Sequence, residues 1–140
     1  MAGKSEGEFR MAGKTNTQRT LEYLRKEGME CCIAERWIIN PKHPAGGIRR
    51  DLFGFADLVA LGENSIIAVQ SCGQAFSEHH KKITQDEYVA PNALKWLECG
   101  GRLMLIGWRK VKLKRLGKAM RWQPRIKEYS LEDFKDGENA

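Results

Sequence analysis

The 140-residue sequence predicts an α/β protein with a mixed β-sheet of about five strands flanked by helices. Short apolar runs rich in β-branched residues alternate with amphipathic segments of helical length. Segments that contain glycine or proline separate these runs. The chain length suits a single domain, and a hydrophobic fraction of 41% is enough to build a core. These observations argue against a wholly disordered chain.

The chain begins with a segment that is poor in apolar residues. Residues 1–14 contain the tetrapeptide MAGK twice, which predicts a flexible leader outside the fold. A first helix is expected over residues 17–27, because Leu21 and Leu24 are three residues apart among good helix formers. Gly28 stands where a glycine commonly ends a helix.

Three strands are expected to follow the first helix. The alternating segment 29–39 predicts a strand, and the turn formers of residues 40–47 predict a loop. The apolar runs 53–61 (FGFADLVAL) and 65–70 (SIIAVQ) are separated by three turn residues. They therefore predict a hairpin that is buried on both faces.

The second half of the chain predicts helices and then strands. Residues 77–85 indicate a short helix, and a second helix is expected from Pro91 to the glycine pair that follows Cys99. Residues 102–108 (RLMLIGW) predict a buried strand, and residues 125–129 predict an edge strand.

One domain is therefore expected over residues 15–132, with a flexible tail at 133–140. Ser130 is expected to cap a final turn in which Asp133 is within reach.

Several classes of protein do not fit the composition. No apolar run approaches the roughly 18 residues of a membrane span, and the N-terminus lacks the apolar stretch of a secretory signal. The four cysteines, at positions 31, 32, 72 and 99, show no CxxC spacing. They suggest neither a disulfide framework nor a zinc knuckle. We expect a protein of the reducing cytoplasm with no membrane partner.

The positive charge is concentrated in one stretch, residues 108–127, which we call the basic segment. It contains nine basic residues and no acidic one, including Arg109, Lys110, Lys112, Lys114, Arg115, Lys118 and Arg121. The other 15 basic residues are outnumbered by the 18 acidic ones, so the rest of the chain has a net charge of −3. Cations interleaved with apolar residues and bordered by Trp108 and Trp122 suit a nucleic-acid backbone. The alternative is a solvated basic hairpin that only keeps the protein in solution.

Two polar residues interrupt the predicted apolar hairpin. Asp57 lies inside FGFADLVAL, where a carboxylate is costly unless it is paired or binds a cation. Gln70 closes the next strand thirteen residues later, so the hairpin can bring the two side chains together. Carboxylate and amide oxygens suit a hard cation such as Mg²⁺. Taken singly, Asp57 could cap backbone donors at a strand end, and Gln70 could be a satisfied buried amide.

Five stretches carry a family resemblance: RRDLFGFADLVAL, IIAVQSCG, HHKKI, NALKWLECGGRLMLIGW and WQPRIKEY. They resemble the PD-(D/E)XK nuclease superfamily, and within it Holliday-junction-resolvase-like and phage restriction-endonuclease-like proteins. The resemblance covers about residues 17–127. It implies a restriction-endonuclease-like core in the order helix, strand, strand, strand, helix, strand. It also implies that Asp57 binds a divalent metal, Mg²⁺ or Mn²⁺.

The chain departs from the family pattern at two positions. Gln70 stands where the family has Glu or Asp, which keeps a carbonyl ligand but removes a negative charge. Cys72 stands at the position of the catalytic lysine, and a thiol is a poor replacement for an ammonium group. Because that lysine sometimes lies on the following helix in the family, Lys82, or else Lys81, is the expected substitute.

Further candidates surround these positions. Asp51 could ligate a second metal, or it could cap a turn or pair with an arginine. Glu35 and Glu22 are weaker acidic candidates, and Glu22 matches a helix-1 glutamate of some resolvases by position only. His79 and His80 could act as bases or phosphate contacts, or be exposed residues without a specific role.

The sequence thus leads to three functional hypotheses. The first is a metal-dependent DNA endonuclease that acts on branched DNA such as a Holliday junction, with a homodimer implied by the resemblance alone. The second is a nucleic-acid-binding module with the same fold and impaired catalysis. The third is a scaffold protein that uses the basic segment against an acidic partner.

Overall fold

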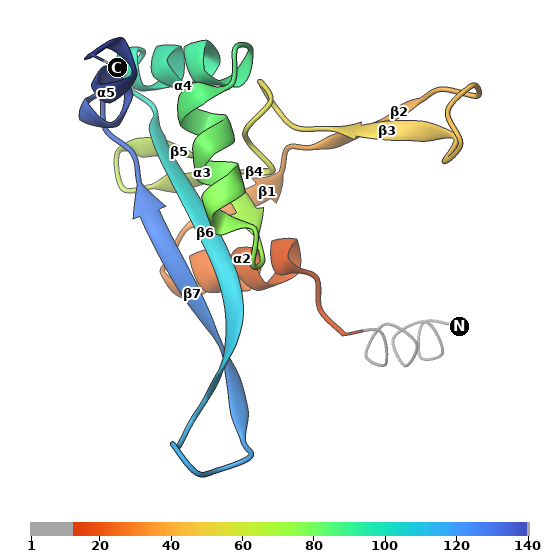
Figure 1. Ribbon diagram of the computed structural model, residues 1–140, viewed down its shortest axis with the longest axis vertical. Helices are drawn as coiled ribbons and strands as arrows, with labels where there is room; N and C mark the ends of the chain where they lie inside the picture. The colour runs from red at the N-terminus through yellow and green to blue at the C-terminus, as the bar shows by residue number, and fades with distance from the viewer. Residues whose placement is uncertain (1–12, 140) are drawn as a thin grey trace.

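The structure is a computed structural model that describes residues 13–139 (Figure 1). Its elements are α2 (Asn16–Lys26), β1 (Glu30–Ile33), β2 (Arg36–Ile39), β3 (Gly47–Arg50), β4 (Leu58–Gly62), β5 (Ser65–Cys72), α3 (Phe76–Gln85), α4 (Val89–Glu98), β6 (Arg102–Lys112), β7 (Met120–Glu128) and α5 (Glu132–Asn139). Five strands form a mixed sheet in the order β1-β4-β5-β6-β7. The expected α/β class with a five-stranded mixed sheet flanked by helices is therefore confirmed.

The register of the sheet explains its mixed character. The short turn after Gly62 makes β4 and β5 an antiparallel hairpin, in which Leu58 is opposite Val69. Helices α3 and α4 then carry the chain across the sheet, so that β6 runs parallel to β5. Strand β7 returns antiparallel to β6 and forms one edge of the sheet, while β1 forms the other.

Each face of the sheet buries its own core. Leu24 of α2 packs with Leu58, Ile67 and Ile106 on one face. On the other face the side chains of α3 and α4 pack with Phe55 and the alternate residues of β5 and β6. This alternation follows from the two-residue period of a strand, which sends successive side chains to opposite faces.

Helix α2 begins and ends as its sequence indicates. The Thr15 hydroxyl accepts a hydrogen bond from the backbone N–H of Gln18, and the Gln18 side chain accepts one from the backbone N–H of Thr15. This reciprocal capping box satisfies donors at the first turn. Gly28 follows the helix with a φ of +87°, a conformation that favours glycine. The helix lies one residue from the expected range at each end.

The strand expected over residues 29–39 is in fact two strands. The chain turns at Ala34 and Glu35, whose backbone N–H groups both donate to the carbonyl oxygen of Asp57. Beyond this turn β2 pairs only with β3, in a separate two-stranded sheet. These strands and their connection, residues 36–50, form an arm that extends away from the body (Figure 1). Alternation alone could not reveal the break, because its cause is a contact with a distant residue.

Other boundaries also differ from the sequence predictions. The strand expected from residue 53 begins at Leu58, because Phe53 and Gly54 have positive φ values of 56° and 86° and form a turn. The edge strand expected at 125–129 is longer and begins at Met120. Helix α5 extends into the residues expected as a tail, and Phe134 packs against the core.

Asp133 lies within reach of Ser130, as expected, since the backbone N–H of Ser130 donates to Asp133 Oδ2 at 2.8 Å. Most of the expected leader, residues 1–12, lies outside the described residues. Within the part that is described, no helix is long and apolar enough to cross a membrane.

Thr20 ties α2 to the sheet. Its Oγ1 accepts a hydrogen bond from Trp108 Nε1 at 2.9 Å and lies 2.8 Å from Ser71 Oγ. Thr20 is fully buried, so its hydroxyl has no access to water.

We predict that Thr20→Val lowers the free energy of unfolding by about 1–3 kcal/mol, because it leaves the buried indole N–H of Trp108 without an acceptor. Urea denaturation followed by circular dichroism measures this decrease. Thr17→Val, at a half-buried position on the same helix, is the matched control. Equal effects of the two substitutions would contradict the importance of the buried hydrogen bonds.

Candidate functional site

Asp57 lies at the entrance to β4, in the middle of the protein. Its backbone N–H donates to the carbonyl oxygen of Val69, which continues the pairing of β4 with β5. Its side chain is buried, and one carboxylate oxygen, Oδ2, accepts hydrogen bonds from Gln70 Nε2 at 2.7 Å and from the backbone N–H of Ser71 at 2.8 Å. The predicted juxtaposition of Asp57 and Gln70 on the hairpin is therefore confirmed.

Two further carboxylates lie beside Asp57. One oxygen each from Glu35, Asp51 and Asp57 lies within 4.8 Å of the others. Glu35 occupies the turn before β2, and Asp51 directly follows β3, so the two ends of the arm bring both residues to the site. Such a group of carboxylate oxygens could hold a metal ion, although it does not identify which one.

The proximity of these carboxylates changes how they titrate. Burial, together with the hydrogen bond and negative charge of Asp51, raises the pKa of Asp57 to about 8; the charge of Glu35 acts in the same direction. The backbone N–H of Ser71 opposes this shift. A cation between the three carboxylates would remove the repulsion, so the donor set could hold a metal ion.

Gln70 has one polar atom left over. Its amide nitrogen donates to Asp57, while its carbonyl oxygen, Oε1, is buried and has no hydrogen-bond partner among the described residues. A buried acceptor without a partner is uncommon in a folded protein. It lies in the same amide group that contacts Asp57, and a cation or its bound water would satisfy it.

Helix α3 brings a cation to the carboxylates. Lys82 is half-buried, and its Nζ lies 4.0 Å from Asp51 Oδ2. Lys81, the alternative that the sequence left open, is exposed on α3. The structure thus places Lys82 beside the acidic cluster, which the sequence favoured on its position alone.

The adjacent histidines have different surroundings. His80 Nδ1 lies 2.7 Å from the Tyr129 hydroxyl, and the two rings stack, so His80 belongs to the packing between α3 and the end of β7. His79 Nδ1 is buried without a partner in the described chain. Burial and then the charge of Lys82 lower the pKa of His79, which favours the neutral imidazole.

Cys72 cannot replace a lysine chemically. Its side chain is buried in the core under α3, and burial, followed by the charge of Asp57, raises the pKa of its thiol to about 11. The thiol is therefore neutral at pH 7 and can supply no positive charge.

A pocket of 580 Å³ lies at the base of the arm, and Asp51 is the member of the acidic cluster that lines it. The pocket is lined by Arg49, Arg50, Asp51, Gly54, Lys82 and Tyr88. Three of these lining residues are cationic and one is a carboxylate. Arg49 and Arg50 were not predicted as site residues, because only the pairing of β2 with β3 brings them to this pocket.

The basic segment forms the projecting β6–β7 hairpin (Figure 1). The seven basic residues named above are all exposed. Because side chains alternate along a strand, Lys110 and Lys112 share the face of Trp108, whereas Arg109 and Arg121 occupy the other face. The basic segment is therefore a two-sided cationic ribbon with a cationic tip.

The tryptophans correct part of the sequence interpretation. Trp108 does not border the basic segment as a free aromatic, since its indole is buried under α2. Trp122 remains 40% exposed, and the Arg19 guanidinium lies 3.6 Å above its ring. Glu22 forms an ion pair with Lys14 at 2.9 Å and is not part of the carboxylate cluster.

We predict that the metal-free protein loses stability as the pH rises from about 4 to about 8, by on the order of 1 kcal/mol per pH unit. Across this range folded Asp57 keeps its proton, because its pKa is raised to about 8, whereas the unfolded chain has released it. Asp57→Asn cannot ionise, so it should become progressively more stable than the wild type as the pH rises. Thermal melts in EDTA from pH 5 to 8.5 measure this difference.

The control is Glu87→Gln, which removes an exposed carboxylate from the turn before α4. Its melting curve should follow that of the wild type at every pH. Parallel curves for Asp57→Asn and the wild type would show that Asp57 is ionised in the folded protein throughout.

No protein-family model, curated protein or solved structure matches the chain. The chemistry of the site therefore rests on its own residues. Three carboxylates, a buried amide and a lysine converge where β4, β5, the arm and α3 meet.

Proposed function

We propose that this protein is a metal-dependent DNA endonuclease with a PD-(D/E)XK-type site. The observation that carries the proposal is the convergence of Glu35, Asp51 and Asp57 with Lys82 at the end of a buried hairpin. Placing the buried Asp57 beside two half-buried carboxylates costs stability, and this cost favours a role in binding a cation.

The order of the elements supports the same proposal. The chain runs in the order α2, β1, β4, β5, α3, α4 and β6, with the arm inserted after β1. Without the arm, this is the helix–strand–strand–strand–helix–strand order of a restriction-endonuclease-like core. Asp57 stands at the start of the second of these core strands and Gln70 near the end of the third, as the resemblance implies.

Each residue of the site has a distinct part in the proposed hydrolysis. A bound divalent cation would activate a water molecule and neutralise phosphate charge. Asp57, Asp51 and Glu35 would hold it, with Gln70 Oε1 as a further oxygen ligand. Lys82 stabilises the negative charge that develops on the phosphate as water oxygen bonds to phosphorus and the bond to the leaving sugar oxygen breaks. Neutral His79, three residues before Lys82 on α3, can accept the proton that water releases.

A non-catalytic nucleic-acid-binding module is the second candidate, and Gln70 and Cys72 favour it. Gln70 reduces the negative charge available to a cation, and Cys72 is a buried neutral thiol. In this case the acidic cluster would be a remnant of the fold, and DNA would be bound through the basic segment alone.

We predict that the protein cleaves DNA with Mg²⁺ or Mn²⁺ and not with EDTA, and that Asp57→Asn lowers the rate at least about 100-fold by removing a cation ligand. Labelled four-way junction, linear duplex and single-stranded DNA should be compared as substrates. Lys82→Met should lower the rate about 10²- to 10³-fold, because it removes charge stabilisation. Lys81→Met is the matched control and should retain activity.

The outcome separates the two candidates. If no substrate is cleaved with either metal while DNA binding persists, the second candidate is correct. If Lys81→Met lowers the rate as much as Lys82→Met, the assignment of the lysine is wrong. Preference for the four-way junction would support the resolvase-like substrate, and a dimeric mass in solution would support the homodimer that such a symmetric junction suits.

We also predict that Lys114→Ala combined with Lys118→Ala makes the salt dependence of duplex binding less steep. Each phosphate that the protein no longer neutralises should reduce the slope of log K against log salt by about 0.9, so the pair should reduce it by about 2. Fluorescence anisotropy between 50 and 200 mM NaCl measures the slope. Lys95→Ala with Lys135→Ala removes the same charge from α4 and α5 and should leave the slope unchanged. Equal slopes for both pairs would favour a partner other than DNA for the basic segment.

A further inference from the structure

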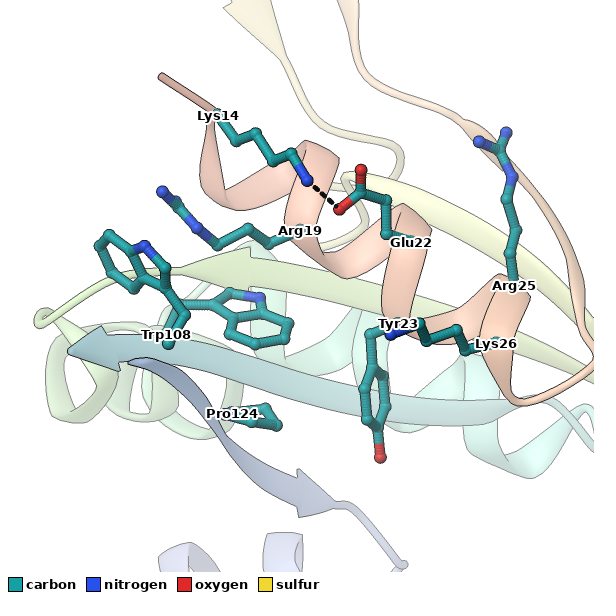
Figure 2. A pocket seen from close by; sticks show the side chains of 9 residues that line it. Lys14, Arg19, Glu22, Tyr23, Arg25, Lys26, Trp108 and Pro124 are labelled. Atoms are coloured by element: carbon teal, nitrogen blue, oxygen red, sulfur yellow. Dashed lines mark hydrogen bonds and ion pairs between the residues drawn. The ribbon is translucent and has the colours of Figure 1, made fainter. Parts of the chain in front are cut away.

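A second, larger pocket lies away from the acidic cluster, between α2 and the β6–β7 hairpin (Figure 2). Its volume is 870 Å³. Its apolar lining consists of Tyr23, Trp108, Trp122 and Pro124. Trp108 contributes a fixed wall, because its ring is buried and its N–H is held by Thr20. The pocket therefore offers flat, rigid surfaces to a ligand.

The rim of this pocket is cationic. Lys14, Arg19, Arg25 and Lys26 come from α2 and the residues just before it, against the single carboxylate of Glu22. Glu22 is engaged by Lys14 at 2.9 Å, as the dashed line in Figure 2 shows. The other three cations, Arg19, Arg25 and Lys26, therefore lie beside the apolar lining and are not paired with Glu22. This combination suits a ligand that is both planar and anionic.

Trp122 and Arg19 are the central pair of this pocket. Trp122 lies opposite Lys110 across the hairpin, on the same strand face as Trp108 and Pro124. Its ring is 40% exposed, and the guanidinium of Arg19 lies 3.6 Å from the ring centre. An indole and a guanidinium plane are the two kinds of surface on which nucleic-acid bases stack.

We propose that this pocket binds an unpaired nucleotide of single-stranded nucleic acid, with its base stacked on the Arg19–Trp122 pair and its phosphates on the rim cations. A base inside a duplex is already stacked on both faces and cannot enter. The inference deepens the proposed function, because it assigns a single-stranded part of the proposed DNA substrate to this pocket. It rests on the proposed function only for the identity of that substrate. The binding itself requires no cleavage.

A short chain of hydrogen bonds joins the pocket to the acidic cluster. Trp108 Nε1 donates to Thr20 Oγ1, which lies 2.8 Å from Ser71 Oγ, and the backbone N–H of Ser71 donates to Asp57. Thr20 and Ser71 thus connect Trp108, in the wall of the pocket, with Asp57 at the centre of the candidate site.

The test is binding without catalysis. In EDTA, the affinities of a fluorescein-labelled 12-residue oligo(dT) and a 12-base-pair duplex are measured by anisotropy for each variant. Trp122→Ala should weaken oligo(dT) binding roughly tenfold, because it removes the surface on which one base stacks, and should change duplex binding less than about twofold. Trp122→Phe should retain most of the affinity, because it keeps an aromatic face.

Two variants make the comparison specific. Trp37→Ala removes a tryptophan that is 53% exposed on the arm, and it should leave oligo(dT) binding unchanged. Arg19→Gln removes the stacked guanidinium and should weaken oligo(dT) binding more than duplex binding, so the test holds even if Trp122→Ala is poorly folded. Oligo(dT) should also bind at least roughly tenfold more tightly than dTMP, because it adds phosphates for the rim cations.

The proposal is overturned if Trp122→Ala and Arg19→Gln weaken oligo(dT) and duplex equally, or weaken neither. Equal affinity for dTMP and oligo(dT) would overturn the assignment to a strand. Failure of the proposed function would give a different result. If no DNA is cleaved but both variants lose oligo(dT) binding selectively, this pocket remains a single-strand site on a non-catalytic module.

Discussion

The rest of the structure depends on the burial of Asp57. Its carbonyl oxygen accepts the N–H groups of Ala34 and Glu35, and this contact turns the chain out of the sheet after β1. Its carboxylate accepts hydrogen bonds from Gln70 and Ser71, which bind it to the end of β5. One residue thus joins β1, β4 and β5 at the point where the arm leaves the body. An ionised carboxylate is costly in this position, and burial accordingly raises the pKa of Asp57 to about 8.

The arm gives the site its remaining acidic groups. Glu35 directly precedes the arm and Asp51 directly follows it. The pairing of β2 with β3 therefore brings together carboxylates that are sixteen positions apart in the sequence. The same pairing brings Arg49 and Arg50 to the lining of the pocket beside Asp51. Cationic and acidic side chains that the proposed function needs are therefore supplied by one hairpin.

Much of the fold follows from local patterns. The capping box of α2, the hairpin of β4 and β5, and the strand after the glycine pair are visible as spacing and turn chemistry. The pairing of Asp57 with Gln70 is also local, because a tight hairpin leaves few registers for residues thirteen positions apart. The break after β1 and the burial of Trp108 were missed. Each depends on a hydrogen bond to a residue more than twenty positions away, which no periodicity reports.

The sequence by itself determined the α/β class, the buried hairpin with its polar pair, and the concentration of positive charge in the basic segment. Only the tertiary structure decided which acids accompany Asp57, that Lys82 and not Lys81 lies beside them, and that the basic segment has two faces. The physical reason is the separation along the chain over which each kind of interaction acts. Propensity, turn chemistry and net charge act between neighbours along the chain, whereas a site depends on how distant segments meet in the packed protein.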